Sequence, residues 1–168
     1  MNIRSLAIGS LLALVVGGLC FAQASIWHSG KRFAAYPAPA YHGRRHQPSF
    51  AGADSANWNM RPVLTKGFAS NPLFAGHYVI VTTECQVHCL FAYVGDVRTG
   101  RTVNFPLGGA AYFDLQLHSL PTSRLLKARW STSGATDAKC TGADMVWNGH
   151  SFAQTPLPIL PGPCPIEH

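Results

Sequence analysis

The sequence predicts an all-β domain, an antiparallel meander of about six to seven short strands that forms a small sandwich or barrel-like sheet. Apolar side chains recur at every second position in several short segments, as is typical of half-buried strands. Glycines, prolines and an Asn-Gly pair separate these segments, as expected of tight turns. No segment has the apolar period of a helix, so the prediction contains no helix.

Residues 1–24 have the pattern of a secretory signal peptide. Arg4 gives a positive start, residues 6–19 form an apolar centre, and Ala22-Gln23-Ala24 is a small-x-small cleavage site. The apolar centre is short and interrupted by glycine, which argues against a membrane span. We therefore expect a periplasmic or extracellular protein with no membrane span after cleavage. Lipidation of Cys20 is an alternative, although Leu19 is larger than the residue that normally precedes a lipidated cysteine.

Residues 25–56 are rich in proline and glycine and have no apolar period, so we expect a flexible, poorly ordered basic linker. His42 and His46 have the spacing of two metal ligands on a helix, but Gly43 and flanking prolines argue against a helix there. We place the β-domain at 57–154, with a short strand or turn over 58–70 leading into it.

The net charge of the chain is concentrated near its N-terminus. The formal value of +6 falls to +5 when Arg4 leaves with the signal peptide. Between Ser25 and Pro62 there are five basic side chains against Asp54 alone, whereas the rest of the chain is nearly neutral. We therefore expect no nucleic-acid partner, and the basic segment suits weak attraction to anionic envelope surfaces.

The strand over 78–83 is the centre of the predicted domain. It is continuously apolar or β-branched, which indicates burial on both faces. A polar turn over 85–89 and a second apolar run over 90–94 follow. Gly100 then supplies the positive φ that a short hairpin loop needs, and Val103 and Phe105 begin the return strand.

Further strands are predicted over 113–117, 124–130, 140–147 and 150–153, with a flexible loop over 107–111 and a hairpin turn at Asn148-Gly149. In the strand over 124–130, Leu126, Ala128 and Trp130 face the core. Lys127 and Arg129 face the other way, where we expect ordinary solvated side chains, as we do for Arg98 and Arg101. The tail over 155–168 is rich in proline and should lie extended on the surface.

Four cysteines remain after cleavage, and an even number in an oxidising compartment indicates two disulfides. Three pairings are possible, of which we favour Cys85–Cys89 and Cys140–Cys164. The first would fix the shape of a turn, and the second would hold the proline-rich tail. The alternative is a metal site made by Cys85, His88 and Cys89, which would need a fourth ligand from elsewhere.

Several short motifs resemble a family of small, uncharacterised exported bacterial proteins rich in β-structure. The motifs are Phe74-Ala75-Gly76-His77-Tyr78, Cys85 with Cys89, Asp96 with Thr99-Gly100, Ser123-Arg124-Leu125-Leu126, and Trp147 with Gly149 and Phe152. The chain departs from this pattern at Leu73 and at Thr83-Glu84, which replace an asparagine and a Trp-Gly pair. The resemblance implies a β-rich fold and an envelope location, but no reaction and no ligand.

The sequence contains no phosphate-binding glycine loop, nucleophile elbow or zinc-protease helix motif. The best catalytic candidates are His77, Glu84, His88 and a thiol at Cys85 or Cys89. Because His88 and Cys89 are neighbours on the chain, their side chains should point to opposite faces, so the histidine would not activate the thiol. We therefore expect neither an enzyme nor a cofactor.

The function that these patterns favour is binding of an envelope protein or polysaccharide by a monomer. The loop Gln86-Val87-His88 is the expected contact, with His77 and Arg124 as further candidates. His77 could equally close the sheet edge through backbone hydrogen bonds, and Arg124 could pair with Asp96 or Asp114. One alternative is an inhibitor of a secreted or cell-wall hydrolase, and another is a thiol- or metal-dependent enzyme.

Overall fold

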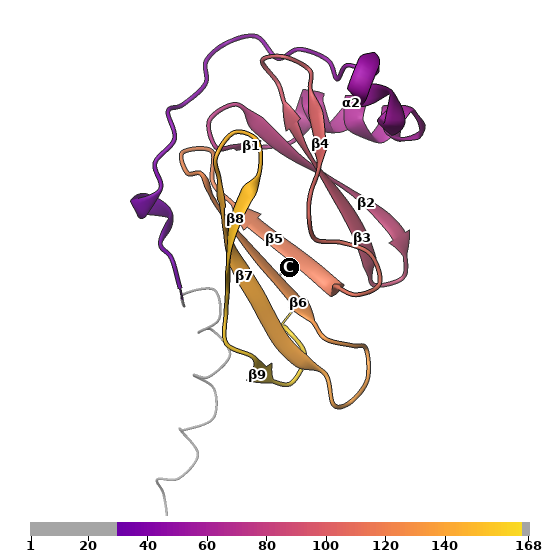
Figure 1. Cartoon of the computed structure of the whole chain (residues 1–168), viewed down its shortest axis with the longest axis vertical. Helices are drawn as coiled ribbons and strands as arrows, with labels where there is room; N and C mark the ends of the chain where they lie inside the picture. The colour runs from indigo at the N-terminus through magenta and orange to yellow at the C-terminus, as the bar shows by residue number, and fades with distance from the viewer. Residues whose placement is uncertain (1–29, 166–168) are drawn as a thin grey trace, which may run out of the picture.

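Two antiparallel sheets pack face to face in the computed structural model, which describes residues 30–165 (Figure 1). The predicted signal peptide and Cys20 lie outside this range. The first sheet has the order β1 (Leu73–Phe74), β2 (Tyr78–Gln86), β3 (Cys89–Asp96), β4 (Thr102–Asn104). The second has the order β5 (Phe113–Ser119), β6 (Leu125–Ser131), β7 (Lys139–Trp147), β8 (Phe152–Pro156), with β9 (Leu160–Pro161) also paired to β7. The all-β prediction is confirmed.

The longer strands correspond to the predicted ones, and their register follows from the two-residue alternation of side chains. Two short strands, β1 and β9, were not predicted, because two residues carry no periodic pattern. The tail forms β9 and the end of β8, so part of it joins the second sheet. Within residues 30–165, no helix has the length and apolar character that a membrane span requires.

The absence of helix was the wrong part of the prediction. A 3-10 helix, η2 (Gly52–Met60), is followed by the α-helix α2 (Arg61–Ser70), and together they include all of residues 58–70, where we expected a short strand or turn. Leu64, Gly67 and Phe68 are the buried face of α2. Three apolar-face positions in ten residues are too few to reveal a helical period in the sequence.

The helix α2 covers the outer face of the first sheet, so the molecule has three layers. Val79 and Val81 of β2 pack against α2, whereas Ile80 on the opposite face packs between the sheets. A Cβ atom at Gly67 would collide with the Val81 side chain, so glycine allows the helix to lie directly on β2. The predicted burial of this strand on both faces is confirmed over its first half.

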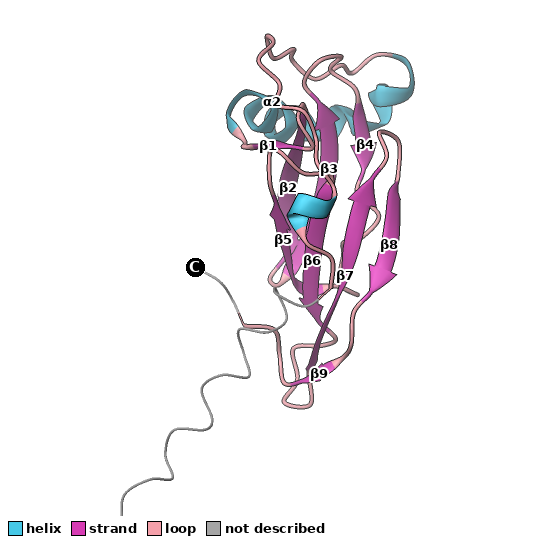
Figure 2. Cartoon of the chain, turned by 90° about the vertical axis from the view of Figure 1, so that its left-hand side faces the viewer, coloured by secondary structure: helices cyan, strands magenta, loops and turns pink. Residues whose placement is uncertain are grey.

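The outer face of the second sheet is also covered, by a segment that we call the N-terminal strap (residues 30–38). The strap contains the 3-10 helix η1 (Phe33–Ala35), which lies in front of the second sheet in Figure 2. Its backbone bonds to the segment before β6, through Ala38 N to Thr122 O at 2.8 Å and Arg124 N to Tyr36 O at 2.8 Å. Residues 25–56 were expected to form a flexible linker, but residues 30–38 are bonded to the second sheet.

The residues that follow the strap are also attached to the domain. His46 N donates to Val97 O at 2.7 Å, and Ser49 N donates to Gly100 O at 2.7 Å. The Tyr41 and Phe50 side chains pack against the apolar cluster between α2 and β2. Proline and glycine here give an extended path whose backbone groups bond to the sheets, although the segment itself contributes no strand.

Lys127 and Arg129 are buried on this outer face, so their prediction as solvated side chains is wrong. Both point away from Leu126 and Ala128 as expected, but the face that they occupy is not open to solvent. The Lys127 and Arg129 side chains are 5% and 0% exposed. The error arose because alternation identifies two faces of a strand without saying what covers the second one.

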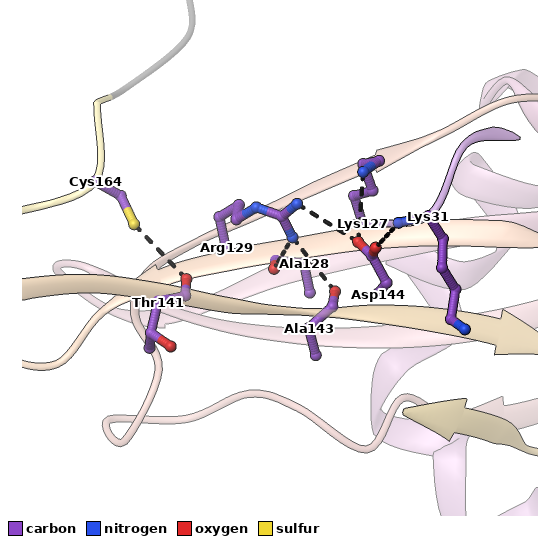
Figure 3. Close-up of polar contacts among 8 residues, drawn as sticks. All are labelled: Lys31, Lys127, Ala128, Arg129, Thr141, Ala143, Asp144 and Cys164. Carbon is purple, nitrogen blue, oxygen red and sulfur yellow. Dashed lines mark hydrogen bonds and ion pairs between the residues drawn. The ribbon is translucent and has the colours of Figure 1, made fainter. Parts of the chain in front are cut away.

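Asp144 of β7 is the acidic partner of these two cations (Figure 3). Its Oδ1 lies 3.5 Å from Lys127 Nζ and 3.5 Å from Arg129 Nη2, and its Oδ2 accepts a 2.5 Å hydrogen bond from Lys31 N of the strap. Burial lowers the pKa of both Lys127 and Arg129, whereas Asp144 opposes that shift. The carboxylate therefore links two strands and the strap.

Gly142 gives the Arg129 side chain its space. It lies opposite Arg129 in the register of β6 and β7, and a Cβ atom there would meet the guanidinium and the Ala128 carbonyl. Arg129 Nη1 donates to Ala128 O at 2.7 Å and to Ala143 O at 3.4 Å. The guanidinium is thus hydrogen-bonded to the sheet backbone as well as to Asp144.

We expect Asp144→Asn to lower the free energy of unfolding by about 3–5 kcal/mol, because the change removes a buried carboxylate that faces two buried cations. Urea denaturation of the disulfide-bonded protein measures this change. Replacing all three charged residues (Lys127→Met, Arg129→Met, Asp144→Leu) should cost less than the single change. If Asp144→Asn lowered the free energy of unfolding by less than about 1 kcal/mol, the cluster would stabilise the fold no more than a surface ion pair does. That result would contradict the prediction.

Both predicted disulfides are present. Cys85 pairs with Cys89 across a Cα–Cα distance of 5.3 Å, and Cys140 pairs with Cys164 across 4.5 Å. The second bridge fixes the tail, because Cys164 N also donates to Ser131 Oγ at 3.0 Å. The tail also lies near the strap, because a Cβ atom at Gly30 would meet the Leu157 side chain. Leu157 N donates to Gly142 O at 2.9 Å beside the buried cluster.

Loss of the two bridges should have different costs. The Cys140–Cys164 bridge spans 24 residues, so replacing both cysteines by alanine should cost about 3 kcal/mol in the chain-entropy description. The Cys85–Cys89 bridge spans only 4 residues, and its removal should cost about 2 kcal/mol. Thermal unfolding of the two double variants compares them, and equal losses would contradict the loop-length argument.

Candidate functional site

The loop Gln86-Val87-His88 forms the turn between β2 and β3, and we call it the disulfide tip. The Cys85–Cys89 bridge closes its base, and the strand register is irregular between Glu84 and Gln86. A bulge at this point increases the local twist and ends the regular pairing. In Figure 1, the tip lies at the end of β2 and β3 that is remote from α2.

His88 holds the disulfide tip against the second sheet. Its backbone is left-handed, with φ of 60°, which is uncommon for a residue other than glycine. The ring stacks on Phe113 with centroids 4.5 Å apart, and Nδ1 lies 2.6 Å from Asp114 Oδ1. Asp114 N donates back to His88 O at 3.2 Å. The tip is therefore held by a disulfide on one side and by β5 on the other.

Val87 is the most exposed large apolar side chain at this end, with 83% of its surface accessible. Beside it is a hollow of about 370 Å³, lined by Glu84, Gln86, Val87, His88, Cys89, Leu90, Asp114 and Leu115. An exposed valine on a rigid turn adds no stability to the folded chain. It can, however, enter a complementary apolar pocket on a partner at little entropic cost.

His77 lies at the opposite end of β2 and does not join the tip. Its Nε2 is 3.8 Å from Asp96 Oδ1, and its ring centroid lies 4.2 Å from that of Tyr78. Val97 N donates to His77 O at 3.0 Å. This backbone bond closes the edge of the strand pair, which is one of the two roles that the sequence suggested for His77. The side chain remains 19% exposed.

Arg124 is likewise separate from the tip, in the turn that precedes β6. Its side chain is exposed, and within residues 30–165 it forms no ion pair with Asp96 or Asp114, the partners that we had expected. Its backbone carbonyl accepts a hydrogen bond from Trp147 N at 2.9 Å. The sequence candidates thus divide between two ends of the molecule.

The environment of His77 makes stability depend on pH. Burial lowers its pKa most strongly; the Asp96 carboxylate opposes this shift, and Arg98 adds to it. As the pH falls below the ordinary histidine value of about 6.5, the unfolded chain therefore binds a proton at this position before the folded protein does. Protonation of His77 thus favours unfolding.

We expect the free energy of unfolding to fall on acidification from about pH 7.5 to about pH 5, and His77→Gln to lose less over the same interval. Urea midpoints at the two pH values give the comparison. His42→Gln, which removes an exposed histidine outside the sheets, is the matched control. If His77→Gln and the wild type lost equal stability, the assigned role of this imidazole would be wrong.

The disulfide at the tip engages both of its cysteines. Cys85 and Cys89 are bonded to each other, so neither sulfur is a thiolate that could attack a substrate. The alternative metal site of Cys85, His88 and Cys89 is not formed for the same reason. Across the described residues, no three His, Cys, Asp or Glu side chains are grouped as metal ligands would be.

A second hollow, which sequence reasoning did not identify, lies at the end opposite the tip. It has a volume of about 450 Å³ and is lined by Tyr78, Val94, Asp96, Arg98, Thr99, Arg101, Val103, Trp147, Gly149 and His150. We call it the turn cavity, because two turns contribute to its wall: 97–101 between β3 and β4, and 148–151 between β7 and β8. Both turns were predicted, but no pattern in the sequence places them at the same end.

The chain was compared with protein-family models, with curated proteins and with solved structures, and it matches none of them. Polar and apolar groups converge on accessible surface at both the disulfide tip and the turn cavity.

Proposed function

We propose that this protein is an exported, non-enzymatic binding domain whose disulfide tip contacts a protein of the cell envelope. The signal-peptide pattern at the N-terminus supports export, and two disulfides fit an oxidising compartment. The resemblance to small exported bacterial proteins agrees with the same location. None of these features names the partner, so the geometry of the tip carries the argument.

The exposure of Val87 is the observation on which the proposal depends. An apolar side chain that is 83% accessible is unremarkable on a mobile loop, but here the loop is braced on both sides. Binding to a braced loop loses little conformational entropy, so a small apolar contact contributes more to affinity. The polar Gln86 and the fixed His88 beside it offer hydrogen-bonding groups that set orientation.

Inhibition of a secreted hydrolase is the second candidate, and the same rigidity favours it. Inhibitors of this type present a preorganised loop that changes little on binding. The disulfide tip would then enter the active-site cleft of a cell-wall lytic enzyme. This alternative differs from the first only in the identity of the partner, so one pair of variants serves to test both.

We expect Gln86→Ser combined with Val87→Ser to weaken capture of the partner, because the change removes the apolar contact and leaves His88 and both cysteines in place. Cross-linking and recovery from an envelope fraction would compare this variant with the wild-type protein. Ile159→Ser is the matched control, since Ile159 is also an exposed apolar residue, 62% accessible, in the tail. Recovery should fall at least about tenfold for the tip variant and stay unchanged for Ile159→Ser.

Equal recovery by the tip variant, or no specific partner for the wild-type protein, would contradict the proposal. The hydrolase alternative is measured separately, by adding the purified protein to lytic enzymes and following cell-wall digestion. A loss of activity that the tip variant fails to produce would identify the partner as a hydrolase.

A further inference from the structure

The turn cavity has an apolar floor. Val94 and Val103 come from β3 and β4 of the first sheet, whereas Trp147 comes from the end of β7 in the second. Tyr78 packs edge-on against Trp147, with ring centroids 5.3 Å apart at an interplanar angle of 77°. A ligand in this hollow would contact apolar atoms of both sheets, and its volume of about 450 Å³ falls within the range of small-molecule sites.

Two guanidinium groups stand at the rim of the turn cavity. Arg98 and Arg101 are exposed, and neither side chain forms an ion pair with any residue in the described range 30–165. His150 of the facing turn is also exposed. A site with two free arginines favours an anionic ligand, and guanidinium geometry matches a carboxylate or phosphate.

The rim is held in place before any ligand arrives. Asp96 Oδ1 accepts a hydrogen bond from Arg98 N at 2.8 Å, and Gly100 N donates to Asp96 O at 2.8 Å. In the facing turn, Asn148 Oδ1 accepts hydrogen bonds from His150 N at 2.9 Å and Ser151 N at 2.8 Å. Both turns are therefore fixed by their own hydrogen bonds, which lowers the entropy lost on binding.

Trp147 adds apolar surface to the wall of the turn cavity. Its side chain is almost entirely buried, and among the described residues its Nε1 has no hydrogen-bond partner. Because Nε1 itself is inaccessible, a ligand in the cavity would contact carbon atoms of the ring rather than this N–H.

Asp96 restricts the class of ligand further. Its carboxylate also lines the cavity and is 17% exposed, so a simple anion would be repelled by it. A ligand that carries hydroxyl groups can donate to Asp96 while its own anionic group meets the arginines. Thr99 and the Tyr78 hydroxyl provide further polar groups around the same hollow.

We propose that the turn cavity binds a carboxylate-bearing sugar unit, of the kind found in acidic polysaccharides. The carboxylate pairs with Arg98 and Arg101, the hydroxyls meet Asp96 and Thr99, and the apolar face of the sugar ring lies on Tyr78. An aromatic or aliphatic carboxylate would satisfy the arginines but leave Asp96 without a donor. This site lies at the opposite end of β2 from the disulfide tip, and it does not depend on the function proposed for the tip.

The test titrates the complete disulfide-bonded protein with tetragalacturonate and follows its amide and indole signals by two-dimensional NMR. We expect shifts in residues 96–101 and 148–151 and in the Trp147 indole signal, which Trp147→Phe assigns. Maltotetraose is the neutral sugar probe, and sodium benzoate is the carboxylate probe without hydroxyls. Both should bind at least about tenfold more weakly than tetragalacturonate.

Variants separate the two recognition elements. Arg98→Gln with Arg101→Gln should weaken tetragalacturonate binding at least about tenfold. Lys66→Gln with Lys139→Gln removes the same charge from α2 and from the far end of β7, and should leave binding unchanged. Asp96→Asn should weaken binding of the sugar but not that of benzoate.

Each other outcome overturns the proposal. No tetragalacturonate binding at millimolar concentration would show that the turn cavity is not a site for such sugars. If maltotetraose bound as tightly as tetragalacturonate, the site would not recognise the carboxylate. If benzoate bound as tightly, the site would not recognise the sugar hydroxyls. If the arginine double variant and the lysine double variant lost the same affinity for tetragalacturonate, the attraction would be due to net charge and not to the turn cavity.

Discussion

The buried carboxylate of Asp144 is the interaction on which the rest of the second sheet depends. It lies between two cations of β6 and accepts a hydrogen bond from the N-terminal strap. An ionic group at this depth is tolerated only where its partners are fixed, and here the strap, the tail and the glycine at position 142 fix them. The outer face of the first sheet is covered by α2, and that of the second is covered by the strap.

The architecture could be predicted because most of its strands are long enough to show alternation. Tyr78–Gln86 and Lys139–Trp147 are nine residues each, and their side chains alternate between two faces. The disulfide pairing could be predicted because one pair closes a short turn and leaves only the other. What the pattern could not supply was the covering of each face. Arg129 has the sequence context of a solvated strand residue, and only the tertiary structure shows that it is 0% exposed.

The candidate site was predicted in part. The braced tip follows from two cysteines four residues apart, and its exposed valine follows from the turn between them. The turn cavity did not follow, because Arg98 and His150 belong to hairpins of different sheets. Local sequence identifies each hairpin, whereas the packing of the sheets decides that their turns meet. His77 was a candidate from the sequence, and its neighbours Tyr78 and Asp96 place it beside this cavity rather than at the tip.

The contact between Lys31 and Asp144 joins positions 113 residues apart, and this separation governs when the molecule can be completed. When the chain emerges from the ribosome or a translocation channel with its N-terminus first, residues 30–38 appear before β7. They cannot make their contact with Asp144 until β7 has also emerged. Contacts between such distant positions slow folding, because the intervening loop has to close first. Two basic side chains on β6 meanwhile keep their hydration shells, which opposes premature collapse of a half-made sheet.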